Sequence, residues 1–323
     1  MKTYPLLKIL ADGELHSGQE LADRAGVSRT AIWKQLRDLE SETGILVERV
    51  RGHGYRLSRA LDLLDSECLH DHLPDALHSR LALTLLTVTD STNSYLAEVD
   101  TTGVDYQVCM AEQQTAGRGR RGRHWVSPFA DNLALSLAFD LEGGGQAVDG
   151  LSLVVGIAVV RALEAVGVSG ARLKWPNDVW LEGRKLAGIL VELRGEAQGG
   201  MKVVVGLGLN VSLSTEQGAG IDQPWITLQD VGVDINGGRN RLAAELIAQA
   251  VMVLDDFRQY GFTHFQTEWA QLDALEGEPV RVVGRDVEGF GAGVDERGCF
   301  LVRVGDDIQV LNAGEVSIRR TRS

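Results

Sequence analysis

A run of four arginines and three glycines occupies residues 117–123, between two segments whose apolar side chains predict core strands. The first segment reads VCMAEQQ and the second reads SPFADNLALSLAF. Glycine lets backbone N–H groups approach an anion closely, and arginine adds planar, charge-assisted hydrogen bonds. A loop of this composition between buried strands predicts a mobile segment that closes over a phosphorylated ligand. The alternative is a disordered tail that binds nucleic acid, but such tails are long, repetitive and flanked by polar sequence.

The length and the cysteine pattern narrow the class of protein. A chain of 323 residues is long enough for two or three domains. It has no apolar run of about 18 residues and no charged-then-apolar leader, so we expect no membrane span and no secretion signal. Its three cysteines, Cys68, Cys109 and Cys299, are far apart and lack metal spacing. They are typical of reduced thiols, which predicts a cytoplasmic location.

The formal net charge of -13 is unevenly distributed. Residues 1–60 contain ten lysines and arginines against eight aspartates and glutamates, a net charge of +2. The remaining residues contain 22 basic against 37 acidic side chains, a net charge of -15. Nucleic acid, if bound, should therefore meet the N-terminal segment.

The N-terminal segment has the pattern helix, tight turn, helix. Ser17 is a candidate N-cap with Glu20 as its capping-box partner. Gly26 permits the turn, and Ser28 caps the second helix.

The second helix has an apolar and a polar face. Its apolar positions at i, i+4 and i+7 should face the core: Ile32, Leu36 and Leu39. Residues 46–50 and 54–57 follow as a two-stranded wing. This pattern resembles a winged helix-turn-helix domain, whose second helix generally enters the major groove of DNA. DNA contacts are expected from the polar face and the wing tip: Arg29, Thr30, Trp33, Lys34, Arg37, Arg51 and His53.

The mode of DNA binding stays open at this point. A winged helix can instead mediate protein contacts alone, and Trp33 lies on the presumed DNA face, where polar residues are more usual. A net charge of +2 is weak for DNA, so we expect a dimer that binds two half-sites.

The remainder of the chain alternates strand and helix patterns. A strand, a polar turn and a helix that starts near Ser91–Asn93 precede the arginine loop. Residues 150–167 are apolar enough for a buried helix, and residues 171–195 read as three strands with a hairpin centred on Glu182-Gly183. A strand and two amphipathic helices follow, over residues 201–213, 241–261 and 262–275. The last fifty or so residues alternate apolar and polar positions, which predicts a small barrel of about five strands.

Five motifs in this order match a known family: Ser91-Thr92-Asn93, QQTAGRGRRGRHWVSP, KWPND, RKLAGILVE and GLGLNV. They resemble the biotin protein ligases. With the winged helix and the barrel, the resemblance covers essentially the whole chain and is to the bifunctional bacterial form, which also represses the biotin operon. It implies an α+β, multidomain fold, with a winged helix-turn-helix domain at 1–63, a mixed-sheet α/β catalytic domain at 64–272 and an SH3-like β-barrel at 273–323. The P-loop pattern GxxxxGK[ST] is absent.

The resemblance implies a two-step reaction that uses biotin, ATP and Mg²⁺. The biotin carboxylate attacks the α-phosphate of ATP to give biotinyl-5′-AMP, and a lysine of the biotin carboxyl carrier protein of acetyl-CoA carboxylase then attacks the mixed anhydride. Negative charge is redistributed in both steps, so most of the rate acceleration should come from positioning the reactants and from preorganised cations. The resemblance also implies that biotinyl-5′-AMP is the corepressor of a homodimer on biotin operator DNA.

The matching motifs assign the expected site residues. Arg118, Arg120 and Lys185 are expected to be catalytic. Biotin is expected to contact Ser91, Thr92, Asn93, Gln114, Arg118, Gly119, Arg120 and Lys185. ATP is expected to contact Arg120, Arg123, Lys174, Asn177, Asn210 and Trp225. Asp178 is expected to hold the metal ion through oxygen.

Each assignment has a plainer alternative. Polar residues at Ser91–Asn93 could be a helix N-cap, and Trp225 could be core packing. Lys185 is expected on an exposed hairpin, where it contributes charge rather than packing. The residues that form the apolar cradle for biotin are not identified by the sequence.

Two other function classes remain. The first is a ligand-sensing transcription factor without ligase activity, against which the intact arginine loop, KWPND and Lys185 argue. The second is a lipoate-type ligase, against which RGRRGRHW, KWPND and the winged helix argue.

Overall fold

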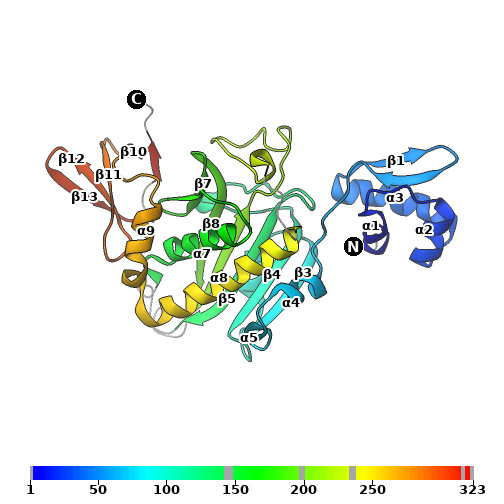
Figure 1. Ribbon diagram of the computed structural model, residues 1–323, viewed down its shortest axis with the longest axis horizontal. Coiled ribbons are helices and arrows are strands. Elements are labelled where there is room, and N and C mark those ends of the chain that lie inside the picture. Colours follow the sequence, from blue (N-terminus) through cyan, green and yellow to red (C-terminus); the bar gives the residue numbers. More distant parts are fainter. Residues whose placement is uncertain (1–2, 142–147, 196–200, 233–237, 314–316, 321–323) are drawn as a thin grey trace.

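The computed structural model describes residues 3–141, 148–195, 201–232, 238–313 and 317–320. These residues form three parts along the long axis of the molecule (Figure 1). A helical unit with a two-stranded hairpin lies at one end, a seven-stranded sheet with helices lies in the middle, and a five-stranded sheet lies at the other end. The predicted α+β, multidomain fold class is confirmed.

The N-terminal unit contains the expected helix-turn-helix and wing. Its elements are α1 (Tyr4–Leu10), α2 (Gly18–Ala25), α3 (Arg29–Thr43), β1 (Val47–Val50) and β2 (Gly54–Leu57). The two strands pair antiparallel.

Local sequence signals define the ends of α2 and α3. The Ser17 hydroxyl accepts a hydrogen bond from the Glu20 N–H, and Ser28 caps α3 in the same way. Gly26 ends α2 in the left-handed region, with φ of 66°. The prediction of a full capping box is wrong in its second half, because the Glu20 carboxylate is hydrogen-bonded to His16 Nδ1 at 2.8 Å.

The predicted faces of α3 are confirmed. Ile32, Leu36 and Leu39 are buried, whereas every predicted DNA-contacting side chain is exposed. Trp33 is 52% exposed, and the Arg37 guanidinium lies 4.9 Å from its ring. Packing therefore does not account for this tryptophan, which remains available to a partner.

The central sheet is mixed. Its order from edge to edge is β3 (Leu81–Thr89), β4 (Tyr106–Gln114), β5 (Leu133–Leu141), β9 (Met201–Leu209), β8 (Arg184–Arg194), β7 (Asp178–Leu181) and β6 (Arg172–Lys174). Strands β3 and β4 are parallel and the other neighbours are antiparallel. The hairpin between β7 and β8 turns at Glu182-Gly183, as predicted, and both residues have positive φ.

Helices cover the sheet. The long helices α7 (Leu151–Ala165) and α8 (Gly238–Tyr260) pack together over one face (Figure 1). The shorter helix α6 packs against β4, β5 and β9 through Leu96, on the side of the sheet that carries the functional residues described below. The remaining helices of this part are α4 (Ser66–His72), α5 (Asp75–His78), α6 (Thr92–Glu98) and α9 (Gln266–Leu272).

The C-terminal sheet has the predicted five short strands. In spatial order they are β13 (Asp307–Leu311), β12 (Phe300–Val304), β11 (Glu288–Val294), β10 (Pro279–Val283) and β14 (Ser317–Arg320), all antiparallel. This arrangement is consistent with an SH3-like unit. Trp175 joins it to the central part, because its ring stacks on Phe300 at 5.3 Å and its Nε1 donates to the Gly298 carbonyl at 3.0 Å.

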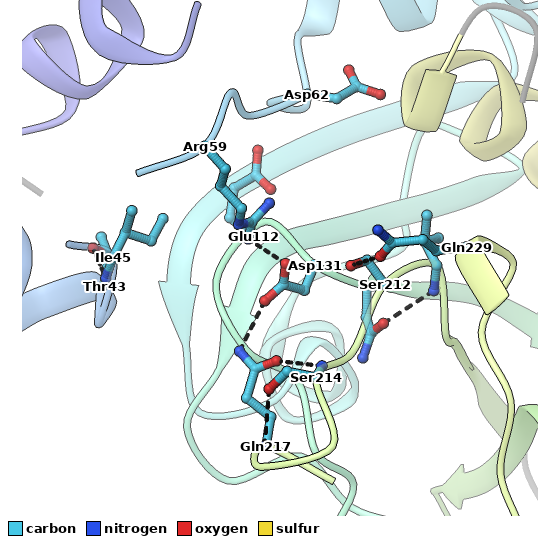
Figure 2. A network of polar contacts seen from close by, with 12 residues as sticks. Thr43, Ile45, Arg59, Asp62, Glu112, Asp131, Ser212, Ser214, Gln217 and Gln229 are labelled. Atoms are coloured by element: carbon cyan, nitrogen blue, oxygen red, sulfur yellow. Dashed lines mark hydrogen bonds and ion pairs between the residues drawn. The ribbon is translucent and has the colours of Figure 1, made fainter. Parts of the chain in front are cut away.

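The winged helix is docked through the segment that follows the arginine loop. Phe129 and Ala130 are buried within the hydrophobic cluster of the N-terminal unit. Beside them Arg59 forms an ion pair with Asp131, and Asp131 also accepts from Gln217 Nε2 at 3.0 Å (Figure 2). One short segment therefore touches both the N-terminal unit and the loops of the central part.

Candidate functional site

A cavity of about 1030 Å³ opens on the central sheet. Its wall comes from the start of α6, the arginine loop, the β6–β7 turn, β8, β9 and the loop that ends at Trp225. All the predicted biotin, ATP and metal residues line it: Ser91, Thr92, Asn93, Gln114, Arg118, Gly119, Arg120, Arg123, Lys174, Asn177, Asp178, Lys185, Asn210 and Trp225. The predicted DNA-binding residues lie elsewhere, on the N-terminal unit.

One end of the cavity holds neutral polar groups. Gln114 Oε1 accepts from the Thr92 N–H at 2.9 Å, and the Ser136 hydroxyl lies 2.6 Å from Asn93 Oδ1 and 2.7 Å from Thr92 Oγ1. Ser91 is the N-cap residue of α6 but makes no side-chain cap hydrogen bond. Capping therefore does not explain its hydroxyl, which faces the cavity with the others.

Sequence reasoning missed Ser136 in this polar group. It is fully buried among apolar neighbours in β5, and it pairs with Gly206 across the β5–β9 ladder. The signal was a single polar residue inside the apolar run LALSLAF. Buried hydroxyls need partners, so such a residue indicates a polar neighbour on the same face.

The floor of the cavity is made of glycines that the sequence analysis also missed. Gly206 and Gly208 alternate along β9 and so point to one face of the sheet, and Gly188 of β8 pairs with Gly208. A Cβ on Gly206 would lie 2.2 Å from Asn93 Oδ1, and one on Gly208 would lie 2.3 Å from the Trp125 ring. The alternation in GLGLN was the available signal. With Trp125, these glycines line the floor of the cavity and leave it open.

The arginine loop also lines the cavity. Arg118 Nη2 donates to Glu192 Oε2 at 3.1 Å. Arg120 donates to Asn177 Oδ1 at 3.3 Å and to the Ala313 carbonyl, both of them neutral acceptors. Burial, with Arg121 beside it, lowers the pKa of the Arg120 guanidinium. An anion in the cavity would therefore stabilise its charge.

A second charged group lies on β7 and β8. Lys185 Nζ is 2.7 Å from Asp178 Oδ1, and Lys174 Nζ is 3.9 Å from Asp178 Oδ2. The Lys185 side chain is only 14% exposed and its ammonium lies 5.5 Å from the Trp125 ring. The expectation that Lys185 is exposed on its hairpin is wrong for the side chain, because the β8 register turns it inward over the cavity floor.

The expected nucleotide residues lie around this charged group. Asn177 Nδ2 donates to the Ile189 carbonyl at 2.7 Å, and Asn210 is buried and donates to the Ile226 carbonyl at 3.3 Å. Trp225 is half-buried on the cavity wall, so core packing alone does not describe it. Among the described residues no group of three or more His, Cys, Asp or Glu side chains could hold a metal ion.

The comparisons with known proteins agree with this geometry. Residues 85–210 match the model described as the Biotin/lipoate A/B protein ligase family, and residues 4–56 match an HTH domain model. The chain is 41% identical over 316 residues to the bifunctional ligase/repressor BirA of Salmonella typhimurium, which covers 97% of this chain and 96% of that protein. The chain belongs to the biotin protein ligase family. Its identity to BirA of Escherichia coli is 40% over the same shares of both chains.

A solved biotin protein ligase shares the fold of the ligase part. The enzyme from Aquifex aeolicus in complex with biotin and ATP has a TM-score of 0.63 and 29% identity, over 74% of this chain and 99% of that one. The ligase class and the presence of a repressor-type DNA-binding domain are therefore confirmed, and a sensor without a ligase domain is excluded. The search for membrane-spanning helices in the described segments found none of sufficient length and apolarity.

Proposed function

We propose that this biotin protein ligase converts biotin and ATP to biotinyl-5′-AMP and pyrophosphate, and then transfers biotin to a lysine of the biotin carboxyl carrier protein of acetyl-CoA carboxylase with release of AMP, in the cytoplasm. The observation that carries this proposal is the polarity of one cavity. Neutral donors and acceptors on α6, β4 and β5 form one hydrogen-bonded group on its wall, and Lys174 and Lys185 form a separate charged group with Asp178. Biotin has the same division, with a neutral ureido head, an apolar body and a carboxylate at the end of its chain.

The residues then have separate tasks. Ser91, Thr92, Asn93 and Gln114 hold the ureido head, and the glycine floor admits the rings. Arg118, Arg120 and Lys185 place the carboxylate against the α-phosphate and stabilise the charge that develops there. The arginine loop keeps water from the anhydride while it waits for the carrier lysine.

Lys174, Asn177, Arg123, Asn210 and Trp225 are the proposed nucleotide contacts. Mg²⁺ often binds through one carboxylate together with substrate phosphates, and the partly buried Asp178 at the cavity wall offers such an oxygen donor. The ion would neutralise part of the phosphate charge when bound with ATP.

The ligase proposal is tested by pyrophosphate release. Purified protein with ATP and Mg²⁺ should release pyrophosphate with biotin and not with lipoate. Release with lipoate alone would favour the lipoate-type alternative, and no release with either acid would contradict the proposal.

We infer that the winged helix binds the biotin operator as part of a homodimer whose corepressor is biotinyl-5′-AMP. The exposed polar face of α3 and the exposed wing tip support this, since both are free of packing roles. The resemblance also implies that the glycine-rich stretch LRGEAQGG, residues 193–200, lies where such repressors form their dimer edge, and its residues 196–200 are outside the described residues. Promoter DNA of biotin synthesis genes should be retained by the protein with biotin and ATP and released without them; equal binding in both conditions would contradict a corepressor role.

A further inference from the structure

Glu192 is a charged residue beside the cavity to which no role has been assigned. It lies near the end of β8, opposite Val204, on the same face of the sheet as Gly188 and Leu190, which line the cavity. Its Oε2 atom accepts two hydrogen bonds, from Asn93 Nδ2 at 2.8 Å and from Arg118 Nη2 at 3.1 Å. One carboxylate oxygen therefore joins the neutral end of the cavity to the arginine loop.

The first of these bonds orients the Asn93 amide. Its Nδ2 donates to Glu192, and its Oδ1 lies 2.6 Å from the Ser136 hydroxyl. An amide held at both ends presents one fixed face to a ligand, because exchanging its nitrogen and oxygen would set the amide oxygen against the Glu192 carboxylate, which can only accept. Gly206 lies beneath the amide and leaves it room there. A Cβ at this position would lie 2.2 Å from Asn93 Oδ1.

The second bond places a fixed negative charge on Arg118. The guanidinium has five N–H donors, and this contact uses one of them. The others remain for a ligand, but part of the positive charge is already offset by Glu192. A biotin carboxylate approaching Arg118 therefore meets a weaker field than an unpaired guanidinium would supply.

We propose that Glu192 is a positioning and specificity-determining residue, which orients Asn93 and Arg118 and sets how strongly the site prefers a carboxylate over a neutral amide. The proposal rests on biotin being the substrate, as proposed above. The preference has a direct consequence for the reaction, since biotin enters as a carboxylate and leaves as the neutral amide of the carrier lysine. By tempering the preference for the anion, Glu192 reduces the penalty that the product-like amide would otherwise meet.

The test compares two ligands in the full-length protein without ATP. Isothermal titration calorimetry with biotin and with biotinamide gives R, the dissociation constant of the amide divided by that of the acid. Glu192→Gln keeps an oxygen that accepts from Asn93 and removes the charge beside Arg118. We expect R to rise about three- to fivefold, as suits a half-exposed ion pair. A change in loop ordering or folding alters the dissociation constants of both ligands by the same factor, so it cancels in R.

Controls separate this charge effect from a general one. Glu268→Gln removes a glutamate of similar exposure that pairs with Arg161, away from the cavity, and should leave R unchanged. Glu192→Asp retains the charge and should keep R near the wild-type value. In an Arg118→Gln background, Glu192→Gln should still raise R, because it removes the unpaired carboxylate that repels the biotin carboxylate.

The outcomes are decisive in each direction. An unchanged R in Glu192→Gln, with biotin still bound, would overturn the role of Glu192. Failure of the wild-type protein to bind biotin would instead overturn the proposed function. If Glu192→Gln is too unstable for calorimetry, the test uses Arg118→Gln instead. This variant leaves the Glu192 carboxylate unpaired, so it should repel biotin and R should fall below the wild-type value. An unchanged R in Arg118→Gln would overturn the proposal.

Discussion

Lys185 Nζ lies 2.7 Å from Asp178 Oδ1, so the expected catalytic lysine and the expected metal ligand neutralise each other in the free protein. The two side chains come from adjacent antiparallel strands, β8 and β7, and both are nearly buried. A phosphate entering the cavity would take over the ammonium, and a cation carried with it would take over the carboxylate. The pair therefore holds both groups in place before ATP arrives, which reduces the ordering needed in the reaction.

Lys185→Ala should abolish most adenylate formation. A charge-assisted contact in a nearly dry site is worth roughly 10²–10³ in turnover. Pyrophosphate release with saturating biotin and ATP measures the loss. Arg184→Ala is the matched control, because Arg184 is the neighbouring cation, pairs with Glu182 on the exposed hairpin and does not line the cavity. Near-normal release by a folded Lys185→Ala protein would contradict the catalytic role.

Gly206→Ala should weaken biotin binding. The new Cβ would lie 2.2 Å from Asn93 Oδ1, far inside contact distance, and the amide would have to move away from the sheet. Losing one well-placed hydrogen bond to the ligand costs about tenfold in affinity. Calorimetry with biotin measures this, and thermal unfolding checks the fold. Adding Asn93→Ala removes the clash and should restore stability without restoring affinity; unaltered biotin binding in the single variant would show that Asn93 does not touch the ligand.

Much of the N-terminal unit could be predicted because its signals are local. Ser17, Gly26 and Ser28 each act within four residues of their own position, and the apolar spacing of α3 needs only the helical period. The capping box failed in one half because Glu20 had a nearer competitor in His16. A contact between neighbours can thus be lost to a residue just outside the motif.

The candidate site was predictable only as a set of motifs. Each motif placed its residues on the right loop or strand, but the sequence did not say which strands would be neighbours. Ser136 meets Asn93 and Gly206 because β5 pairs with β9, and Lys185 turns inward because of the register between β7 and β8. Side-chain direction in a sheet depends on register, and register depends on long-range pairing.

Asp273 should make the stability of the C-terminal part depend on pH. Burial raises the pKa of its carboxyl to about 7, and its Oδ2 has no partner among the described residues. The unfolded chain ionises near pH 4, so the folded state binds the proton more tightly and stability falls as pH rises from about 4 to 7. Asp273→Asn should remove this fall and stabilise the protein at pH 8 by on the order of 2–4 kcal/mol.

The measurement for Asp273 is the denaturant midpoint at several pH values. The difference between Asp273→Asn and wild type should grow between pH 4 and pH 7 and then level off. Asp306→Asn, which changes an exposed aspartate in the turn between β12 and β13, should give a small difference that does not grow. A constant difference for Asp273→Asn would show that this carboxyl is already compensated in the folded protein.

Phe129→Ala should loosen the winged helix from the ligase part. Phe129 follows the arginine loop in sequence but is 1% exposed within the hydrophobic cluster of the N-terminal unit. Two residues further along the chain, Asp131 forms the ion pair with Arg59. Removing a buried phenylalanine costs about 3–5 kcal/mol, whereas a half-exposed ion pair such as Arg59–Asp131 contributes about 0–1 kcal/mol. Limited proteolysis near residues 58–65 should therefore accelerate strongly in Phe129→Ala and little in Arg59→Gln. Phe290→Ala, which truncates a ring that is 52% exposed, should leave the rate of proteolysis unchanged.

Phe129 also anchors the end of the arginine loop, so Phe129→Ala should release biotinyl-5′-AMP faster than wild type. Rates of proteolysis and of ligand release equal to those of wild type would show that the two parts do not depend on this contact.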